Sequence, residues 1–154
     1  MNKAELKEIL EQHKIWLESE GRKGKRADLK GTKLQGANLQ RAYLYGAYLY
    51  GANLEGADLK DANLKGAILK GAILKGADLE GTNLKGANLE GANLYSTDLE
   101  GANFYRAHLV GAKFTTEFRE CSYFERASVS KEQLYWLCLH PRFKEFLPTL
   151  KIVQ

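Results

Sequence analysis

A leucine or phenylalanine occupies every fifth position from Leu29 to Phe114, eighteen times without interruption. Two positions before it stands Ala at fifteen of these sites and Thr at the other three. Two positions after it stands Gly at thirteen of the eighteen sites. The repeating unit is therefore A-(N/D)-L-x-G, and this repeat constrains the fold more than any other feature of the chain.

A period of five fits neither a helix nor a flat strand. On an α-helix, each step of five residues rotates the leucine by about 140°, so the leucines form no stripe. On one flat strand, an odd period places alternate leucines on opposite faces. A chain that turns by about a right angle once per repeat removes the conflict, because the small residue and the leucine then always point inward. The pattern thus predicts coils whose sides stack as parallel strands about 4.8 Å apart.

The tandem A-(N/D)-L-x-G motif resembles that of the pentapeptide repeat proteins. The resemblance implies an all-β solenoid, a right-handed quadrilateral β-helix with about twenty residues per coil. A helical cap is expected at each end, because an open solenoid exposes strand edges and core. Coils of that length divide the inward residues into four ladders, which we number as faces. Face 1 contains Leu29, Leu49, Leu69, Leu89 and Leu109; face 2 contains Leu34, Leu54, Leu74, Leu94 and Phe114; face 3 contains Leu39, Leu59, Leu79 and Leu99; face 4 contains Leu44, Leu64, Leu84 and Phe104.

The middle of these ladders is the predicted structural core. A leucine there has a coil above and below it, and truncating one to alanine removes buried contacts. The predicted core residues are Leu49, Leu54, Leu59, Leu64, Leu69, Leu74, Leu79 and Leu84.

The sequence divides into three segments. Residues 1–26 form a predicted N-terminal cap, in which apolar side chains recur at helical spacing over residues 3–19, followed by a charged turn. Residues 27–129 form the β-helix, with the repeat regular to residue 116. A bulge is predicted near residues 115–120, because Glu117 and Arg119 fall where inward residues belong. The register returns at Phe124 and Val129.

Residues 130–154 form the predicted C-terminal cap. Ser130 and Gln133 have the spacing of a capping box, which predicts a helix from Lys131 to about Leu139. The tail is rich in apolar residues, and related proteins dimerise through C-terminal elements, so the resemblance favours a homodimer at this end. The alternative is that the tail folds back and hides these residues within one chain. The candidate dimer residues are Trp136, Phe143, Phe146, Leu147 and Leu150.

Residues with catalytic or ligand chemistry are isolated in this sequence. The three histidines occur singly and lack metal-ligand spacing. Cys121 and Cys138 are expected to be reduced, buried thiols, and whether they lie close together stays open. The recurrent Asn and Asp are expected to bond nearby backbone groups rather than ligands. We therefore predict no catalytic residues, no cofactor, no metal site and no enzymatic activity.

Charge and hydropathy limit the classes of partner. The net charge is +4, but basic and acidic residues are mixed throughout the chain. This distribution lacks the basic block typical of nucleic-acid binders, so no direct nucleic-acid binding is expected. No apolar run approaches the roughly 20 residues of a membrane span, and the first residues are too charged for a signal peptide. We expect a cytoplasmic protein without membrane contact.

Two sets of outward side chains form the candidate partner surface. On face 3, an acidic column contains Asp58, Asp78 and Asp98, with Glu80 and Glu100 beside it. Six acidic and two basic side chains give the outward positions of face 3 a net charge of −4, whereas face 4 has +3. An apolar and aromatic set spans the corner between faces 4 and 1, and packing between coils is its alternative role. This set contains Tyr43, Tyr45, Tyr48, Tyr50 and Ile68.

The predicted function is a non-enzymatic module that binds or scaffolds a protein partner of unknown identity. The resemblance offers an alternative, because some pentapeptide repeat proteins protect DNA gyrase from quinolones or toxins by mimicking DNA. This chain departs from that pattern, since its net charge is positive and its stacked acids lie on one face. The alternative function is a modulator of gyrase or another topoisomerase.

Overall fold

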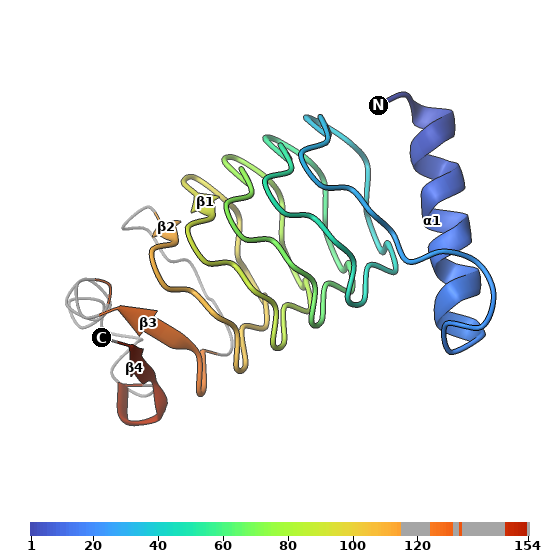
Figure 1. The fold of residues 1–154 in the computed structure, drawn as a ribbon. Helices are drawn as coiled ribbons and strands as arrows, with labels where there is room; N and C mark the ends of the chain where they lie inside the picture. The colour runs from blue at the N-terminus through green and yellow to red at the C-terminus, as the bar shows by residue number, and fades with distance from the viewer. Residues whose placement is uncertain (115–123, 131–132, 134–146, 154) are drawn as a thin grey trace.

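The structure is a computed structural model that describes residues 1–114, 124–130, 133 and 147–153. Stacked coils form a rod, with one helix across its N-terminal end and two short paired strands at the other (Figure 1). The elements in chain order are α1 (Lys3–Glu18), β1 (Asn93–Leu94), β2 (Lys113–Phe114), β3 (Ser128–Ser130), the 3-10 helix η2 (Leu147–Thr149) and β4 (Lys151–Val153).

The coils have the predicted four-sided geometry. Parallel bridges join residues twenty positions apart, as in the series Tyr48–Ile68–Asn88 on face 1. The pairing of β1 with β2 has the same step, with Asn93 opposite Lys113. Each side is extended for only a few residues before the chain turns, so most sides are single bridges rather than long strands. The chain is a right-handed quadrilateral β-helix, and the predicted fold class is confirmed.

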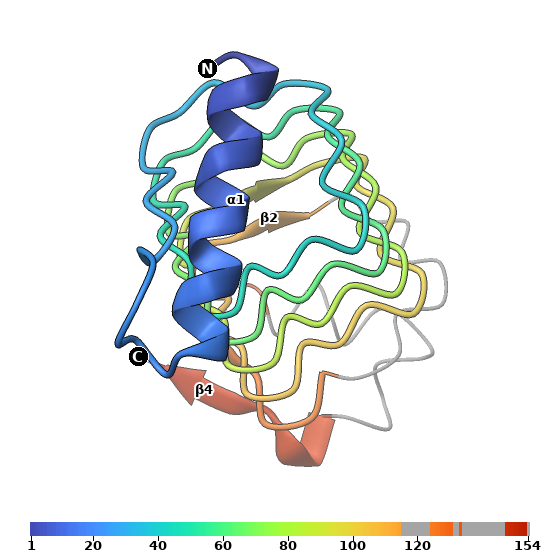
Figure 2. The same cartoon turned by 90° about the vertical axis from the view of Figure 1, so that its right-hand side faces the viewer.

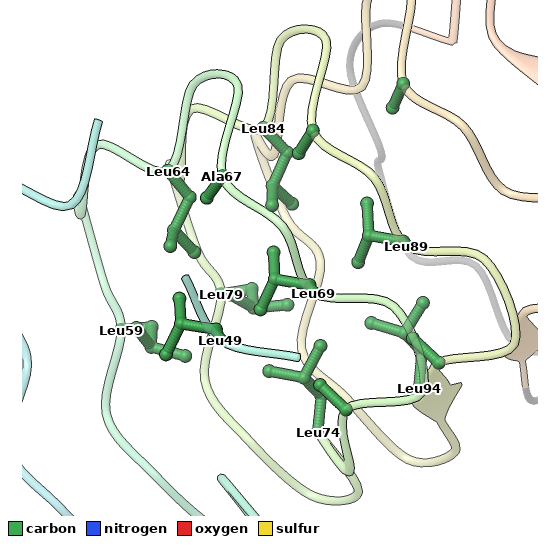
Figure 3. Packing of buried hydrophobic residues seen from close by; sticks show 14 of the residues in the cluster. Leu49, Leu59, Leu64, Ala67, Leu69, Leu74, Leu79, Leu84, Leu89 and Leu94 are labelled. Carbon is green, nitrogen blue, oxygen red and sulfur yellow. The ribbon is translucent and has the colours of Figure 1, made fainter. Parts of the chain in front are cut away.

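The interior of the rod is apolar and closed to solvent. All eight leucines predicted as the core have no exposed surface, and the alanines between them are equally buried. Side chains from successive coils point into the same space and pack on one another (Figure 3). Because each coil buries its leucines against the next coil, the array forms one continuous core.

The corners explain the fourth and fifth positions of the repeat. At a typical corner, the amide of Ala72 donates to the carbonyl of Leu69 at 2.9 Å, which closes a four-residue turn. The third residue of that turn is Gly71, with φ of 65°, a left-handed conformation that glycine adopts freely. Five described corners place another residue in this left-handed conformation: Arg41, Asp61, Ser96, Arg106 and Arg126.

The Asn and Asp side chains brace these same corners. The Oδ1 atom of Asn63 accepts a hydrogen bond from the amide of Lys65 at 3.2 Å, and Asp78 accepts one from Glu80 at 2.9 Å. The same bond recurs on all four faces of the rod. The prediction that these residues bond nearby backbone is confirmed.

Helix α1 covers the first coil (Figure 2). It begins with a capping box in which Asn2 Oδ1 accepts from the Glu5 amide and Glu5 Oε2 accepts from the Asn2 amide. Its apolar side chains Leu6, Ile9 and Leu10 pack against the array core. The predicted helix over residues 3–19 corresponds to Lys3–Glu18, although the sequence analysis did not identify the cap at Asn2.

The C-terminal end differs from a purely helical cap. Phe124 and Val129 are buried in the predicted register, and Phe124 stacks on Phe104 with ring centroids 4.7 Å apart. Strand β4 pairs in parallel with β3, with Lys151 opposite Ser128. This last strand extends the face 1 ladder by one step, because Ser128 is itself bridged to His108. The sequence analysis did not predict β4.

Some predicted C-terminal features lie outside the described residues, namely the bulge near 115–120 and most of the helix from Lys131 to Leu139. The capping box itself is present. The amide of Ser130 donates to Gln133 Oε1 at 2.8 Å, and the amide of Gln133 donates to Ser130 Oγ at 3.3 Å. The Gln133 amide group also donates to the carbonyl of Ala112 at 2.9 Å, which ties this segment to the array.

Candidate functional site

The outward side chains of the array are the candidate site, because the inward ones are committed to the core. Hydrogen bonds from the backbone of the turns hold the Oδ1 atoms of the outward Asn residues, as at Asn63 and Asn83. The side chains that follow each inward leucine stand at the corners, stacked above their counterparts twenty residues away. Each corner therefore carries a column of side chains along the rod.

The acidic column on face 3 lies where the sequence placed it, since parallel bridges join Asp58 to Asp78 and Asp78 to Asp98. Lys60 Nζ contacts Glu80 Oε2 at 2.5 Å. The hydrogen bond to Glu80 raises the pKa of Lys60, and the charges of Asp78 and Asp61 add to this effect against the opposing effect of desolvation. Asp98 and Glu100 make no ion pair within the described part of the chain, so the acidic character increases towards the C-terminal end of face 3.

The aromatic set is divided by the structure. Tyr43, Tyr45 and Tyr50 have exposed fractions of 62%, 43% and 53%. Tyr48 is half-buried instead, because the guanidinium carbon of Arg26 lies 3.9 Å from its ring centroid and Arg26 Nη1 donates to its hydroxyl at 2.8 Å. Tyr48 therefore packs against Arg26 within the chain, and only part of its side chain is exposed to a partner.

Two further contacts complete the description of this set. Lys30 Nζ lies 4.5 Å from the Tyr48 ring on face 1 and bonds Asp28, which lowers the pKa of that carboxyl. Ile68, bridged to Tyr48, is half-buried. Sequence reasoning left Ile73 and Tyr95 out of the candidate set, yet both side chains are exposed. Their outward position in the repeat was the signal that could have identified them.

Face 4 carries the positive charge. Lys65, Lys85 and Arg106 are exposed, and no acidic residue occupies an outward position of this face between Tyr43 and Arg106. Lys65 Nζ lies 5.7 Å from the Tyr45 ring centroid, and the guanidinium carbon of Arg106 lies 5.1 Å from that of Tyr105. Adjacent faces of the rod therefore have opposite charge.

A buried histidine joins helix α1 to the first coil. His13 Nδ1 accepts a hydrogen bond from the Ala27 amide at 3.1 Å, and its ring stacks on Trp16. Its Nε2 atom is buried without a well-formed hydrogen bond. Burial lowers the pKa of His13, the backbone of Tyr45 partly opposes the shift, and the positive charge of Arg26 adds to it. The neutral ring is the form that this junction requires.

Most of the candidate dimer residues lie outside the described residues. Trp136, Phe143 and Phe146 are outside the described residues, and Leu147 falls within η2. Leu150 is buried within the chain, so it is not available to a second copy. Ile152 and Val153 on β4 are exposed at the same end.

Within the described ranges, no three His, Cys, Asp or Glu side chains are placed to hold a metal ion. Cys121 and Cys138 lie outside these ranges. Among the residues that can be placed, no helix has the length and apolar character to cross a membrane.

Comparison with known proteins identifies the repeat. The profile of a family described as "Pentapeptide repeats" matches eight copies, over residues 25–61, 47–86, 57–94 and 82–116. No curated protein matches the chain.

Solved structures with the same architecture fall into two groups by identity. A pentapeptide repeat protein from the Arabidopsis thaliana thylakoid lumen is 32% identical, with 73% of this chain and 71% of that one covered and a TM-score of 0.58. Rfr23 from the cyanobacterium Cyanothece 51142 is 42% identical over 62% of this chain and 65% of its own, with a TM-score of 0.59. QnrB1, a plasmid-mediated fluoroquinolone resistance protein, is 19% identical over 78% of this chain and 74% of its own, with a TM-score of 0.56. The likeness to QnrB1 extends to the fold alone.

Proposed function

Because this chain belongs to the pentapeptide repeat family, we propose that it is a non-enzymatic scaffold whose outward side chains bind a protein partner. The observation that carries this proposal is the separation of charge around the rod. Face 3 has a net charge of −4 and face 4 has +3, although both share the same apolar interior. The interior does not require this separation, because outward side chains do not enter the core.

A rigid rod is suited to this role. Each side is tied to the coils on either side of it by backbone hydrogen bonds, such as Leu69 to Asn88 at 2.7 Å and Ile68 to Ala47 at 2.9 Å. Side chains held at a fixed spacing lose little freedom when they bind, which lowers the entropic cost of association. A cytoplasmic location stays part of the proposal, while one relative comes from a thylakoid lumen.

Cross-linking tests the scaffold proposal. The full chain, carrying a photoreactive group on face 3 or face 4, is exposed to lysate of the native host, and cross-linked proteins are identified by mass spectrometry. We expect a partner that is captured from one of these two faces and not from the other. Capture of the same mixture from every face contradicts a specific scaffold.

The acidic column of face 3 favours a second candidate, a modulator of DNA gyrase or another topoisomerase. Asp58, Asp78 and Asp98 present carboxylates at the intercoil spacing of about 4.8 Å. A supercoiling assay with gyrase, with and without a quinolone, tests this candidate. Protection that is lost on replacing Asp78 and Asp98 by Asn supports it, and an unchanged quinolone response at excess protein eliminates it.

The homodimer also stays a proposal. Exposed Ile152 and Val153 at the C-terminal end support it, whereas the burial of Leu150 removes one candidate contact. Light scattering of the full chain decides between a monomer and a dimer, and Ile152→Lys identifies whether β4 takes part.

A further inference from the structure

The charges of stacked corner residues can be compared at the four corners of two successive coils. At each corner, the residue after an inward leucine stacks on the residue twenty positions later. Three of the four corners have opposite charges in contact: Glu55 with Lys75 at 3.5 Å, Lys60 with Glu80 at 2.5 Å, and Lys70 with Glu90 at 3.0 Å. The fourth corner, on face 4, has Lys65 and Lys85.

This lysine pair is unfavourable for the fold. Like charges on directly opposed positions of neighbouring strands repel, whereas opposite charges attract. Neither Lys65 nor Lys85 has an ion pair among the residues that can be placed, and both are exposed. A glutamate at position 85 would reproduce the arrangement of the other three corners. Face 4 thus keeps a repulsive pair where the same two coils show that an attractive pair fits.

Aromatic and polar side chains surround the lysine pair on face 4. Tyr45 precedes the pair in the column and Tyr105 follows it, and each ring lies near a cation of the same face. Beside the column, the Oδ1 atoms of Asn63 and Asn83 are held by the amides of Lys65 and Lys85, both at 3.2 Å. Both asparagine side chains are partly exposed on the same face. Cations suit a ligand that carries carboxylates, and aromatic side chains are enriched at protein interfaces.

We propose that face 4 binds an extended, acidic segment of a protein partner, with Lys65 and Lys85 contacting its carboxylates. This inference rests on the proposed scaffold function and names the chemistry of its partner. Charge on face 3 limits the width of the ligand on one side, because Asp78, Asp98 and Glu100 repel an anion that extends from face 4 across the corner between these two faces. The phosphate backbones of a DNA duplex are separated by a major groove about 12 Å wide, and three cations neutralise few of its phosphates. A single extended peptide is narrow enough to stay on face 4.

The test uses the full chain and two matched variants, Lys85→Glu and Lys75→Glu. Both change the net charge equally, but Lys75 belongs to a salt bridge on another corner. The probe is a fluorescent peptide of alternating Glu and Ser, and its binding is followed by anisotropy at about 0.15 M ionic strength. We expect Lys85→Glu to weaken binding by roughly tenfold or more, and Lys75→Glu to leave it nearly unchanged.

Thermal melting of the same proteins supplies the second measurement. Lys85→Glu is expected to melt at or above the wild-type temperature, since Lys65 gains an opposite charge. Lys75→Glu is expected to melt lower, since Glu55 loses its partner. A variant that binds less while its stability is kept or improved supports a binding role for the lysine pair.

Several outcomes overturn the inference. One is an equal loss of peptide binding in the two variants, and another is no binding by the wild type at about 1 mM peptide. Tighter binding of a short DNA duplex than of the peptide, or self-association that only Lys85→Glu removes, would also contradict the proposal. A host protein that cross-links equally to the wild type and to Lys85→Glu would leave the scaffold function standing and eliminate face 4 as its site.

Discussion

The array interior and the N-terminal junction are held together in different ways. In the array, every contact recurs from coil to coil, so Leu69 has equivalents in Leu49 and Leu89, and no titratable side chain is involved. At the junction, each contact occurs once: the Ala27 amide donates to His13, and Arg26 donates to the Gly46 carbonyl and to Tyr48. Repetition spreads the stability of the array over many small terms, whereas the junction depends on a few polar groups.

The largest effect is expected from a charge placed inside the array. Ala72 has no exposed surface, so Ala72→Glu buries a carboxylate among leucines and should cost more than about 4 kcal/mol or prevent folding. Ala72→Thr is the control, because Thr82 occupies the equivalent position and donates to the Leu59 carbonyl at 2.8 Å. Urea denaturation measures both. An Ala72→Glu variant as stable as Ala72→Thr contradicts a dry interior.

Truncation of a core leucine should follow in size. Leu69→Ala removes buried contacts with the coils above and below and should cost about 2–5 kcal/mol. Leu6→Ala on α1 should cost less, because Leu6 is only partly buried against the first coil. Equal losses of unfolding free energy in the two variants would mean that cap and array are not distinct in their packing.

The sequence predicts the repetitive part well for a physical reason. The inward side chain, such as Leu69, recurs eighteen times at a spacing of five residues, so the spacing alone indicates that it is buried. The helix over residues 3–19 was also visible from its apolar spacing. Unique contacts gave no such signal: the bond from Ala27 to His13 and the position of Arg26 over Tyr48 join residues from separate elements. Strand β4 was missed because a strand of three residues, close after the proline-containing 3-10 helix η2, shows little periodicity.

In the candidate site, too, some features could be predicted from the repeat and others could not. The acidic column of face 3 follows from a period of twenty, and its stacking was predictable. The ion pair between Lys60 and Glu80 was not, because it depends on side-chain conformation as well as on register. Tyr48 was assigned to a free surface for the same reason, since nothing in the repeat indicates that Arg26 covers it.

Lowering the pH should reduce the stability of the junction and leave that of the array unchanged. The folded protein holds the pKa of His13 below its ordinary value of 6.5, so the unfolded chain binds a proton more readily. Stability is therefore complete above about pH 6.5 and falls as the pH drops below that value towards the lower pKa of the folded state. Thermal melts between about pH 7.5 and about pH 5 measure the loss.

The control for this prediction is His13→Asn, which keeps a hydrogen-bond acceptor near the Ala27 amide and does not titrate. Its stability should change little over the same range. The pKa of Asp28 lies below its ordinary value of 3.8, so this carboxyl stays ionised throughout. An identical loss in the wild type and in His13→Asn would assign the effect to another group.

The smallest effects are expected at the corners. Gly86 has φ of 64° and open space where a Cβ would lie, so Gly86→Ala should cost about 1–2 kcal/mol through backbone conformation alone. Ser96 occupies the same conformation with φ of 55°, so Ser96→Gly should stabilise the chain by about 0.5–1 kcal/mol. Chemical denaturation of both variants tests the pair, and the same sign in both would exclude this explanation of the glycine positions.

Hydrogen exchange at single-residue resolution tests most directly the claim that the cap and the array are held separately. Exchange of the wild type is compared at about pH 7 and about pH 5 after correction for the intrinsic rates. The account predicts that α1 and the Ala27 amide lose protection at the lower pH while the amides of Leu69 and Leu89 keep theirs. Loss of protection in α1 and the array together, or in neither, would contradict it.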